Sequence, residues 1–303
     1  NPMTLEKITL GRYLFYDKNL SANQTQSCAS CHEQAYAFGE NQPTSVGSTG
    51  QQHRRNAQAL VNIAYNKTLT WAHDGILSLE RQILLPMFGE SPVELGITGY
   101  EKEILARFHT PQYQVLFQKA FPDQEISYLL IVKSLASFVR SLISLNSPFD
   151  RYAYYGEDDV LTASELRGMN LFFSEKLECH HCHGGFNFTQ STSHEKQPLD
   201  RRPFHNTGLF NVAYDDGSAG YPLSDTGLAE ISTLARDNGR FRAPTLRNIA
   251  VSAPYMHDGS IVTLSEVVDM YARGGRMVVS GEHAGDGKLN PQKSQFIRGF
   301  ELT

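Results

Sequence analysis

Apolar residues recur every three or four positions in several stretches of the chain, a spacing that is typical of amphipathic helices. Residues 4–15 form one such stretch, and the pattern predicts that Leu5, Ile8 and Leu14 face inward. Residues 162–172 form another, which begins with Thr162-Ala163-Ser164-Glu165, a capping box that marks the first turn of a helix. Both stretches end in Gly-x-x-Leu-Phe, which is a first indication that the chain contains a repeat.

Further helices are predicted at three places, residues 101–108, 111–120 and 126–145. The last stretch is nearly long enough to cross a membrane, but Lys133 and Arg140 interrupt it and its apolar residues keep helical spacing. We therefore interpret it as a buried amphipathic helix. Residues 184–238 are instead polar and rich in Gly, Asp, Ser and Thr, so they are predicted to form loops. The pattern as a whole predicts a mostly α fold with long loops.

Two Cys-x-x-Cys-His motifs, residues 28–32 and 179–183, use all four cysteines of the chain. This spacing is the attachment signature of c-type haem, in which the thiols bond to the porphyrin and the His reaches the iron. A redox dithiol or a zinc site is the alternative, but zinc would require a second Cys or His pair beside each motif, and no other segment has that spacing. We therefore expect two covalently bound c-type haems, held by Cys28, Cys31 and His32 and by Cys179, Cys182 and His183.

The similarity between the two halves extends beyond these motifs. Three pairs of segments align, residues 57–64 with 243–250, 71–75 with 255–259, and 78–79 with 263–264. We interpret this as an internal duplication. Pro, Gly and an acidic run within residues 147–159 mark the link between the copies. The sequence therefore predicts two cytochrome c-like haem domains, at residues 1–150 and 151–303.

The alignment of the two halves also shows which residue of each half could ligate the haem iron in addition to the His of the motif. After the capping box at residues 263–266, Leu264, Val268 and Tyr271 share a helix face that is predicted to be buried, and Met270 lies off it. Aligning Leu79 with Leu264 gives an offset of 185 residues, which places Pro86 opposite Tyr271.

Because a Pro side chain cannot ligate iron, the first haem is expected to keep an open position, while the second receives the Tyr271 oxygen. An open haem can bind and cleave peroxide, whereas a haem with two protein ligands passes electrons. We therefore assign peroxide reactivity to the N-terminal domain and electron transfer to the C-terminal domain. Other candidate ligands remain open, namely Met256, Met270 and His257 for the second iron and His53 and His73 for the first. Tyr271 also remains open as a core tyrosine whose hydroxyl is hydrogen-bonded elsewhere.

Peroxide cleavage also requires a group that moves a proton between the two peroxide oxygens. Gln82, one helical turn before Pro86, and Glu94 are the candidates. The alternative is a solvated polar face, which is the commoner situation for a Glu taken at random. Trp71 is the only tryptophan, and Tyr255 is its partner in the repeat, so oxidisable aromatics occupy equivalent positions in the two halves. A role in core packing is the alternative for Trp71.

Composition limits the class of protein further. Hydrophobic residues make up 40% of the chain and charged residues 19%, values typical of globular proteins. A net charge of −5 argues against nucleic-acid binding, which requires a basic surface. No apolar run reaches transmembrane length, and no signal peptide is visible, which indicates a mature or trimmed chain. Because haem is attached to this motif outside the bacterial cytoplasm, we expect an exported protein that is periplasmic or exposed at the cell surface.

Residues 11–275 resemble the bacterial dihaem cytochrome c peroxidase and MauG superfamily. The segments that carry the resemblance are residues 11–15, 27–32, 55–57, 241–248 and 253–259. The resemblance implies that Trp71 lies between the two haems, and that Glu94 and Gln82 are the distal polar groups of the peroxide-binding haem. It also implies one calcium ion, with Asn56, Ser252 and Pro254 as its protein ligands.

Tyr271 and Pro86, which the repeat places at equivalent positions, indicate which branch of the superfamily the chain resembles. The peroxidases of this superfamily have Met at the position of Tyr271 and a His that closes the first haem until reduction, whereas MauG-like members have Tyr and an open first haem. Residues 47–50, 69–72 and 86–90 resemble the MbnH-type branch, whose copper-binding partner proteins have a tryptophan oxidised to kynurenine. The chain departs from the superfamily pattern at His73, whose role stays open.

These observations predict an enzyme that uses hydrogen peroxide to reach a high-valent iron state and then oxidises a protein partner, with tryptophan as the oxidised residue and a copper-binding protein as the expected partner. A cytochrome c peroxidase that receives electrons from a small cytochrome c or cupredoxin is the first alternative. A non-catalytic dihaem electron carrier is the second.

Overall fold

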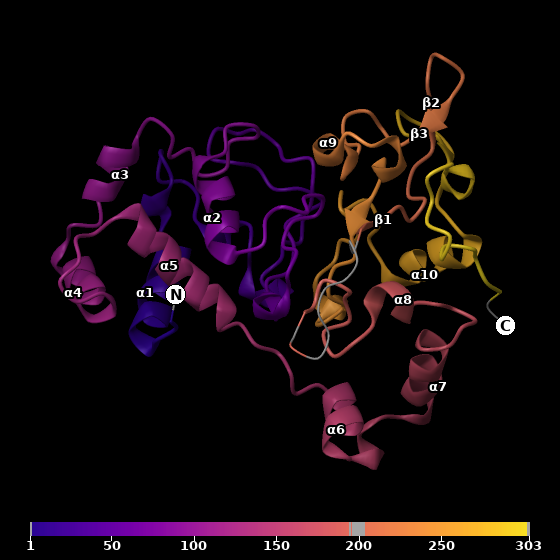
Figure 1. The fold of residues 1–303 in the computed structure, drawn as a ribbon, viewed down its shortest axis with the longest axis horizontal. Helices are drawn as coiled ribbons and strands as arrows, with labels where there is room; N and C mark the ends of the chain where they lie inside the picture. The colour runs from indigo at the N-terminus through magenta and orange to yellow at the C-terminus, as the bar shows by residue number, and fades with distance from the viewer. Residues whose placement is uncertain (1, 194, 196–203, 302–303) are drawn as a thin grey trace. The chain divides into compact units, whose positions relative to one another are not determined.

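The computed structural model describes residues 2–193, 195 and 204–301 (Figure 1). These residues form ten α-helices and three sheets, each made of two antiparallel strands of two residues. The expectation of a mostly α fold is confirmed. Within the described residues, no helix is long and apolar enough to cross a membrane.

The chain divides into two compact units, and each unit is built from three segments. Unit 1 contains Asn1–Ala64, Ile76–Ile143 and Ala250–Ser260, and unit 2 contains Tyr65–Gly75, Ser144–Ile249 and Ile261–Thr303. The main change of unit follows Ile143, whereas the sequence predicts a boundary at residue 150. Each unit also includes a short segment from the other half of the chain, and these two exchanged segments contain residues 71–75 and 255–259, which the repeat aligns.

Unit 1 is a helical unit in which α1 packs against α4 and α5, and α2 packs against α5 (Figure 1). Its helices are α1 (Leu5–Tyr16), α2 (Leu79–Phe88), α3 (Glu101–Ala106), α4 (Pro111–Ala120) and α5 (Tyr128–Arg140), with 3-10 turns η1 (Lys18–Leu20), η2 (Cys28–Ser30) and η3 (Gln34–Tyr36). Two further turns, η4 (Ile63–Tyr65) and η7 (Ile249–Val251), lie where the chain changes unit. Close packing of α1 on α5 requires Gly11, because a Cβ there would lie 2.0 Å from the Ser134 carbonyl oxygen.

The buried face of α1 differs from the predicted one. Leu14 is buried as expected, but Leu5 is 73% exposed, because it lies in the first turn of α1, and Leu10 and Phe15 are buried instead. The helix predicted within residues 126–145 is confirmed as the buried helix α5 (Tyr128–Arg140). Its last residue, Arg140, forms two hydrogen bonds of 2.7 Å with the carboxylate of Glu80 on α2.

Unit 2 combines short helices with small two-stranded sheets. Its helices are α6 (Pro148–Tyr155), α7 (Ala163–Phe172), α8 (His180–His183), α9 (Ala229–Ser232) and α10 (Leu264–Arg273), with turns η5 (Asp158–Val160), η6 (Ala235–Asp237) and η8 (Gly287–Leu289). The paired strands are β1 (Phe204–His205) with β4 (Phe241–Arg242), β2 (Val212–Ala213) with β3 (Ala219–Gly220), and β5 (Met277–Val278) with β6 (Gly285–Asp286). Residues 184–238 are thus predominantly loop, with three short strands and α9, while residues 194 and 196–203 lie outside the described part. The capping boxes predicted for α7 and α10 are confirmed.

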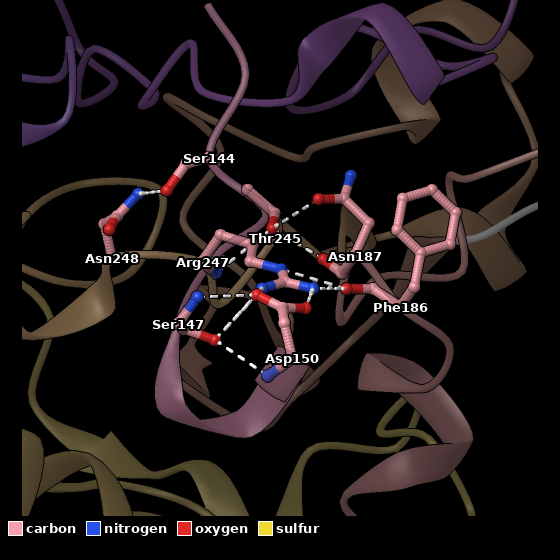
Figure 2. Close-up of polar contacts among 8 residues, drawn as sticks. All are labelled: Ser144, Ser147, Asp150, Phe186, Asn187, Thr245, Arg247 and Asn248. Carbon is pink, nitrogen blue, oxygen red and sulfur yellow. Dashed lines mark hydrogen bonds and ion pairs between the residues drawn. The ribbon is translucent and has the colours of Figure 1, made fainter. Parts of the chain in front are cut away.

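A buried ion pair fixes α6 within unit 2 (Figure 2). The guanidinium of Arg247 donates to both carboxylate oxygens of Asp150, at 2.5 and 2.7 Å, and its Nε donates to the Phe186 carbonyl at 2.9 Å. Ser147 donates from its backbone to Asp150 at 2.9 Å and begins the helix. Because Phe186 lies three residues after His183, the ion pair links α6 to the loop that follows the second Cys-x-x-Cys-His motif.

Candidate active site

The first Cys-x-x-Cys-His motif forms a tight turn, η2, in which the Ser27 backbone donates to the Ser30 hydroxyl at 3.0 Å. His32 Nδ1 lies 2.8 Å from the Phe38 carbonyl oxygen. A carbonyl oxygen only accepts hydrogen bonds, so Nδ1 must carry the hydrogen, and the lone pair of the imidazole is on Nε2. This is the tautomer that an iron-bound proximal His requires.

The second motif repeats this arrangement. His183 Nδ1 lies 3.1 Å from the Pro244 carbonyl oxygen and 3.3 Å from that of Phe188, which again leaves the lone pair on Nε2. Phe38 and Phe188 both have positive φ, at 60° and 49°, a conformation that non-glycine residues rarely adopt. None of the four cysteines forms a disulfide. Both motifs therefore fit covalent haem attachment with a proximal His.

Three candidate residues for peroxide chemistry, Gln82, Pro86 and Glu94, belong to unit 1. The Leu95 backbone donates to the Pro86 carbonyl at 3.0 Å, and this bond brings the adjacent Glu94 to the end of α2. The Glu94 carbonyl in turn accepts from the Ser48 backbone at 2.8 Å. Gln82 lies on α2 one turn before Pro86. The structure thus positions Glu94 beside the C-terminal end of α2, near Pro86, with Gln82 one turn earlier on the same helix.

Glu94 has the electrostatic character of an acid–base group. Burial raises the pKa of its carboxyl to about 7, although the side chain is 41% exposed. Burial, and after it the charges of Cys31 and Glu94, raise the pKa of the Cys28 thiol to about 12, which places Glu94 within electrostatic reach of the first motif. Glu94 Oε1 also lies 3.9 Å from His53 Nδ1.

Two buried polar atoms of unit 1 have no hydrogen-bond partner among the described residues: Nε2 of His53, whose ring lies beside Glu94, and Oε1 of Gln82 on α2. Buried polar atoms without partners are uncommon in proteins, and each costs free energy unless a ligand or water satisfies it. A peroxide molecule, which both donates and accepts hydrogen bonds, is a suitable partner. This observation indicates that the residues around Glu94 fit a small polar ligand.

Tyr271 lies on α10, close to the second motif. Burial, and after it the nearby thiols of Cys182 and Cys179, raise the pKa of Tyr271. The prediction that its helix face is buried is wrong at two positions, because Leu264 is 37% exposed and Val268 is 43% exposed. The position of Tyr271 near Cys179 and Cys182 fits a ligand of the second haem.

The rival ligands have defined environments. Met270 is buried within unit 2. Met256 and His257 belong to unit 1, whereas the second motif belongs to unit 2. His73 belongs to unit 2, and its Nδ1 accepts a hydrogen bond from the Gly75 backbone at 2.9 Å. Only His53 combines membership of unit 1 with a buried ring nitrogen that lacks a partner within the described residues.

The candidate calcium ligands Asn56, Ser252 and Pro254 all belong to unit 1. The Asn56 backbone donates to the His257 carbonyl at 2.7 Å, which ties Asn56 to the exchanged segment that contains the other two. Its side-chain nitrogen donates to the Gln42 carbonyl at 3.0 Å, so the orientation of the amide oxygen is set. One amide and two carbonyl oxygens form a donor set that suits calcium when waters complete it.

Comparison with known proteins decides the family. The model of the di-haem cytochrome c peroxidase family matches residues 5–159. Cytochrome-c peroxidase IdrP1 of Pseudomonas sp. (strain SCT) is 35% identical over 286 residues, covering 91% of this chain and 74% of that protein. Methylamine utilization protein MauG of Methylophilus methylotrophus is 32% identical over 278 residues, covering 89% and 73%. The chain belongs to the di-haem cytochrome c peroxidase family.

A solved structure agrees with this assignment. The crystal structure of a MauG-like protein associated with microbial copper homeostasis matches this di-haem peroxidase with a TM-score of 0.94 and 45% sequence identity, covering 100% of this chain and 86% of the other. Membership makes the chain a haem peroxidase-type oxidoreductase with two c-type haems, and implies a peroxide substrate and a protein partner or electron donor. Relatives are named both peroxidase and MauG, so family membership alone does not identify the group that is oxidised.

The structure of this di-haem peroxidase also contains site residues that sequence reasoning missed. Arg242 is fully buried, and burial lowers its pKa to about 10. Its backbone donates to the Trp71 carbonyl at 2.7 Å and its Nε donates to the Thr70 carbonyl at 3.0 Å, so it holds the backbone of the only tryptophan. Arg242 lies in segment 241–248, which carries part of the resemblance to the superfamily, but nothing in the sequence connects that segment with Trp71.

Glu40 is a second missed residue. Its buried carboxylate accepts from the Ser45 hydroxyl at 2.6 Å and from the Ala57 backbone at 2.7 Å. Burial raises the pKa of Glu40, and its charge acts on Cys31. Glu40 thus anchors the chain beside the first motif, and no sequence pattern distinguishes it from a surface Glu.

Proposed function

We propose that this di-haem peroxidase uses hydrogen peroxide to oxidise a protein partner, with a tryptophan of the partner as the oxidised group. The observation that carries the proposal is the contrast between the two sites. Pro86, which has no ligating atom, lies with Glu94 and Gln82 in the unit of the first motif, whereas Tyr271 lies beside the second. Cys28, Cys31 and His32 would then hold the haem that supplies peroxide reactivity, and Cys179, Cys182, His183 and Tyr271 would hold the haem that supplies electron transfer.

The haems, when bound, supply the reduction of peroxide and the storage of oxidising equivalents. Peroxide gains two electrons and two protons and leaves as two water molecules. A partner tryptophan supplies them when one water molecule adds its oxygen to the indole, because that step releases two electrons and two protons. Glu94 accepts the proton from the peroxide oxygen that approaches the iron and returns it to the oxygen that leaves. Gln82 Oε1 accepts a hydrogen bond from the same peroxide. A pKa of about 7 suits this work, because the carboxyl exchanges protons readily near neutral pH.

Tyr271 distinguishes the second site chemically. A phenolate oxygen is an anionic donor that favours oxidised over reduced iron, which suits an enzyme that holds oxidising equivalents until the partner arrives. We assign electron transfer between the haems to Trp71, whose backbone Arg242 holds. The matched environments of His32 and His183, and of Phe38 and Phe188, support the proposal that the two haem units arose by duplication.

Cellular context completes the proposal. Covalent haem attachment supports an exported protein, periplasmic or at the cell surface, and Asn56, Ser252 and Pro254 supply oxygen ligands for one calcium ion. A similar solved structure is described as associated with copper homeostasis, which supports a copper-binding protein as the partner. The test is mass spectrometry of such a partner after treatment with peroxide and the fully oxidised enzyme. We expect oxygen addition at a tryptophan; an unmodified partner, together with rapid peroxide turnover by reduced cytochrome c, would contradict the proposal.

A peroxidase that requires prior reduction is the second candidate function, and His53 favours it. Its Nε2 is buried near Glu94 without a partner in the described residues, so it has the chemistry to close the first iron. His53→Ala separates the two functions. If the first haem is open, as we propose, the substitution leaves its high-spin ferric spectrum unchanged. A conversion from low-spin to high-spin in the variant would establish His53 as a ligand and favour the reductively activated peroxidase.

A further inference from the structure

A cluster of three metal-ligating side chains lies outside the proposed peroxide site, with Glu175 between α7 and α8 and two histidines, His180 and His181, on α8. Glu175 Oε1 is 3.5 Å from His180 Nε2, and Glu175 Oε2 is 3.4 Å from His181 Nε2. The ligating atoms of all three residues lie within 4.8 Å of one another. Among the residues that the structure describes, no other group of three His, Cys, Asp or Glu side chains meets this condition.

The two imidazoles are arranged to present the same nitrogen. Their ring centroids are 4.3 Å apart with an interplanar angle of 32°, and the His181 ring stacks on Phe296 with centroids 4.9 Å apart. The stacking holds His181 in place. His180 Nδ1 is buried and has no hydrogen-bond partner within the described residues, so this ring can carry its hydrogen on Nδ1 and keep the lone pair on Nε2.

An ion pair is the ordinary explanation of this geometry, but it accounts for the cluster poorly. Glu175 is 78% exposed, and exposed ion pairs contribute little to stability. The two carboxylate oxygens of Glu175 each face one imidazole Nε2 at a similar distance. A metal ion bound by the carboxylate and by both ring nitrogens accounts for the convergence of all three side chains.

We propose that Glu175, His180 and His181 bind a divalent first-row transition-metal ion, with Cu(II) held more tightly than Zn(II). Imidazole nitrogen suits both ions, and the general order of stability places Cu(II) above Zn(II) for a site of nitrogen and oxygen donors. Three protein ligands, of which Glu175 is exposed and both histidines are partly exposed, leave positions for water or for a ligand from another molecule. His180 and His181 are the two residues between Cys179 and Cys182, so the ion lies next to the cysteines of the second motif.

Calorimetric titration of the haem-loaded protein with Cu(II), and separately with Zn(II), tests the site. We expect one equivalent to bind, and Glu175→Gln to weaken binding at least about tenfold, since changes even outside the first ligand shell cost roughly 10–100-fold. Glu175 lies outside the Cys-x-x-Cys-His motif, so this variant keeps haem attachment. The matched control is the double variant Glu282→Gln with His109→Asn, which changes an exposed Glu and an exposed His elsewhere. Equal binding by wild type and Glu175→Gln, or an equal loss in the control, would overturn the proposal.

Electron paramagnetic resonance locates the ion. Bound Cu(II) should show nitrogen hyperfine splitting, and His181→Asn should reduce the number of coupled nitrogens. Cu(II) should also accelerate the spin relaxation of the second haem. This second measurement rests on the proposed attachment of that haem at Cys179 and Cys182. A Cu(II) signal without nitrogen coupling would overturn the metal site. Nitrogen coupling without faster haem relaxation would instead contradict the proposed position of the second haem and leave the metal site supported.

Discussion

Glu94 is the residue on which the proposed peroxide chemistry depends most directly. Its carboxyl must be ionised to accept a proton, and burial raises its pKa to about 7. We therefore expect the rate of reaction with peroxide to rise as pH increases through about 7 and to level off above it. Glu94→Gln should lower the rate by roughly 100- to 10,000-fold and remove the pH dependence. Stopped-flow absorbance measures both.

The same pKa shift has a consequence for stability. Because the folded-state pKa lies above the unfolded value of Glu, the folded protein binds more protons in this interval, and the contribution of Glu94 to stability is lost as pH rises through about 7. Glu94→Gln should therefore be stabilising relative to wild type above pH 7, which thermal unfolding at two pH values measures. A wild-type pH profile for peroxide reactivity in the Gln variant would show that Glu94 is not the acid–base group.

Tyr271 and Met270 are neighbours in sequence, and they separate two assignments of the second iron ligand. Tyr271→Phe removes the phenolic oxygen and keeps the ring, so we expect the absorbance and magnetic spectra of the second haem to change while haem content stays the same. Met270→Leu replaces a buried side chain of α10 by one of similar size that has no sulfur, so it should leave those spectra unchanged. The reverse result would make Met270 the ligand.

The sequence can indicate residues whose role is encoded in local spacing, but it does not reveal residues whose role depends on tertiary contacts. The Cys-x-x-Cys-His motifs place their Cys and His within a single turn, so short segments identify them. Arg242 and Thr70 are 172 residues apart in the chain, and Glu40 and Ala57 are 17 apart, so only folding brings them together. No periodicity in the sequence records such a contact.

At the scale of elements, the glycines of the two Gly-x-x-Leu-Phe patterns form a matched pair. Gly11 on α1 meets α5 so closely that a Cβ would lie 2.0 Å from the Ser134 oxygen, whereas Gly168 on α7 has no atom within 4 Å of that position. Gly11→Ala should therefore cost about 1–3 kcal/mol of unfolding free energy through overpacking. Gly168→Ala should gain about 0.5–1 kcal/mol, because Ala is the better helix former. Urea denaturation measures both, and two changes of the same sign would contradict the packing of α1 on α5.

Helix positions were predictable because their signals are local. The capping boxes of α7 and α10 and the Pro at the start of α4 identify helix starts from a few adjacent residues. Which face of a helix is buried was less predictable, since Leu5 on α1 and Leu264 on α10 are apolar and exposed. Strands of two residues, such as β1, are too short to produce an alternating pattern.

At the scale of the whole molecule, the repeat pointed to the two exchanged segments, but it did not show that each of them belongs to the unit formed mainly by the other half of the chain. Residues 71–75 and 255–259 align in sequence, yet each belongs to the unit built mainly from the other half of the chain. Hydrophobic pattern assigns a segment to a helix or a loop and contains no information on which unit it joins. A division of the sequence at one point therefore could not describe these units.

The exchange predicts that the two units unfold together. The Tyr65–Gly75 segment of unit 2 is connected at both ends to unit 1, so unfolding of unit 1 would free both of its ends. Within this segment the Trp71 carbonyl accepts a hydrogen bond from the Arg242 backbone, which also belongs to unit 2. Multi-domain chains commonly unfold in separate steps, so a single step would be informative. We expect hydrogen exchange in increasing urea, followed by mass spectrometry, to give one midpoint for peptides from α5 in unit 1 and α10 in unit 2. Gly11→Ala should lower both midpoints together, although the substitution lies in unit 1. A lower midpoint for α5 with an unchanged midpoint for α10 would show that the exchanged segments do not couple the units.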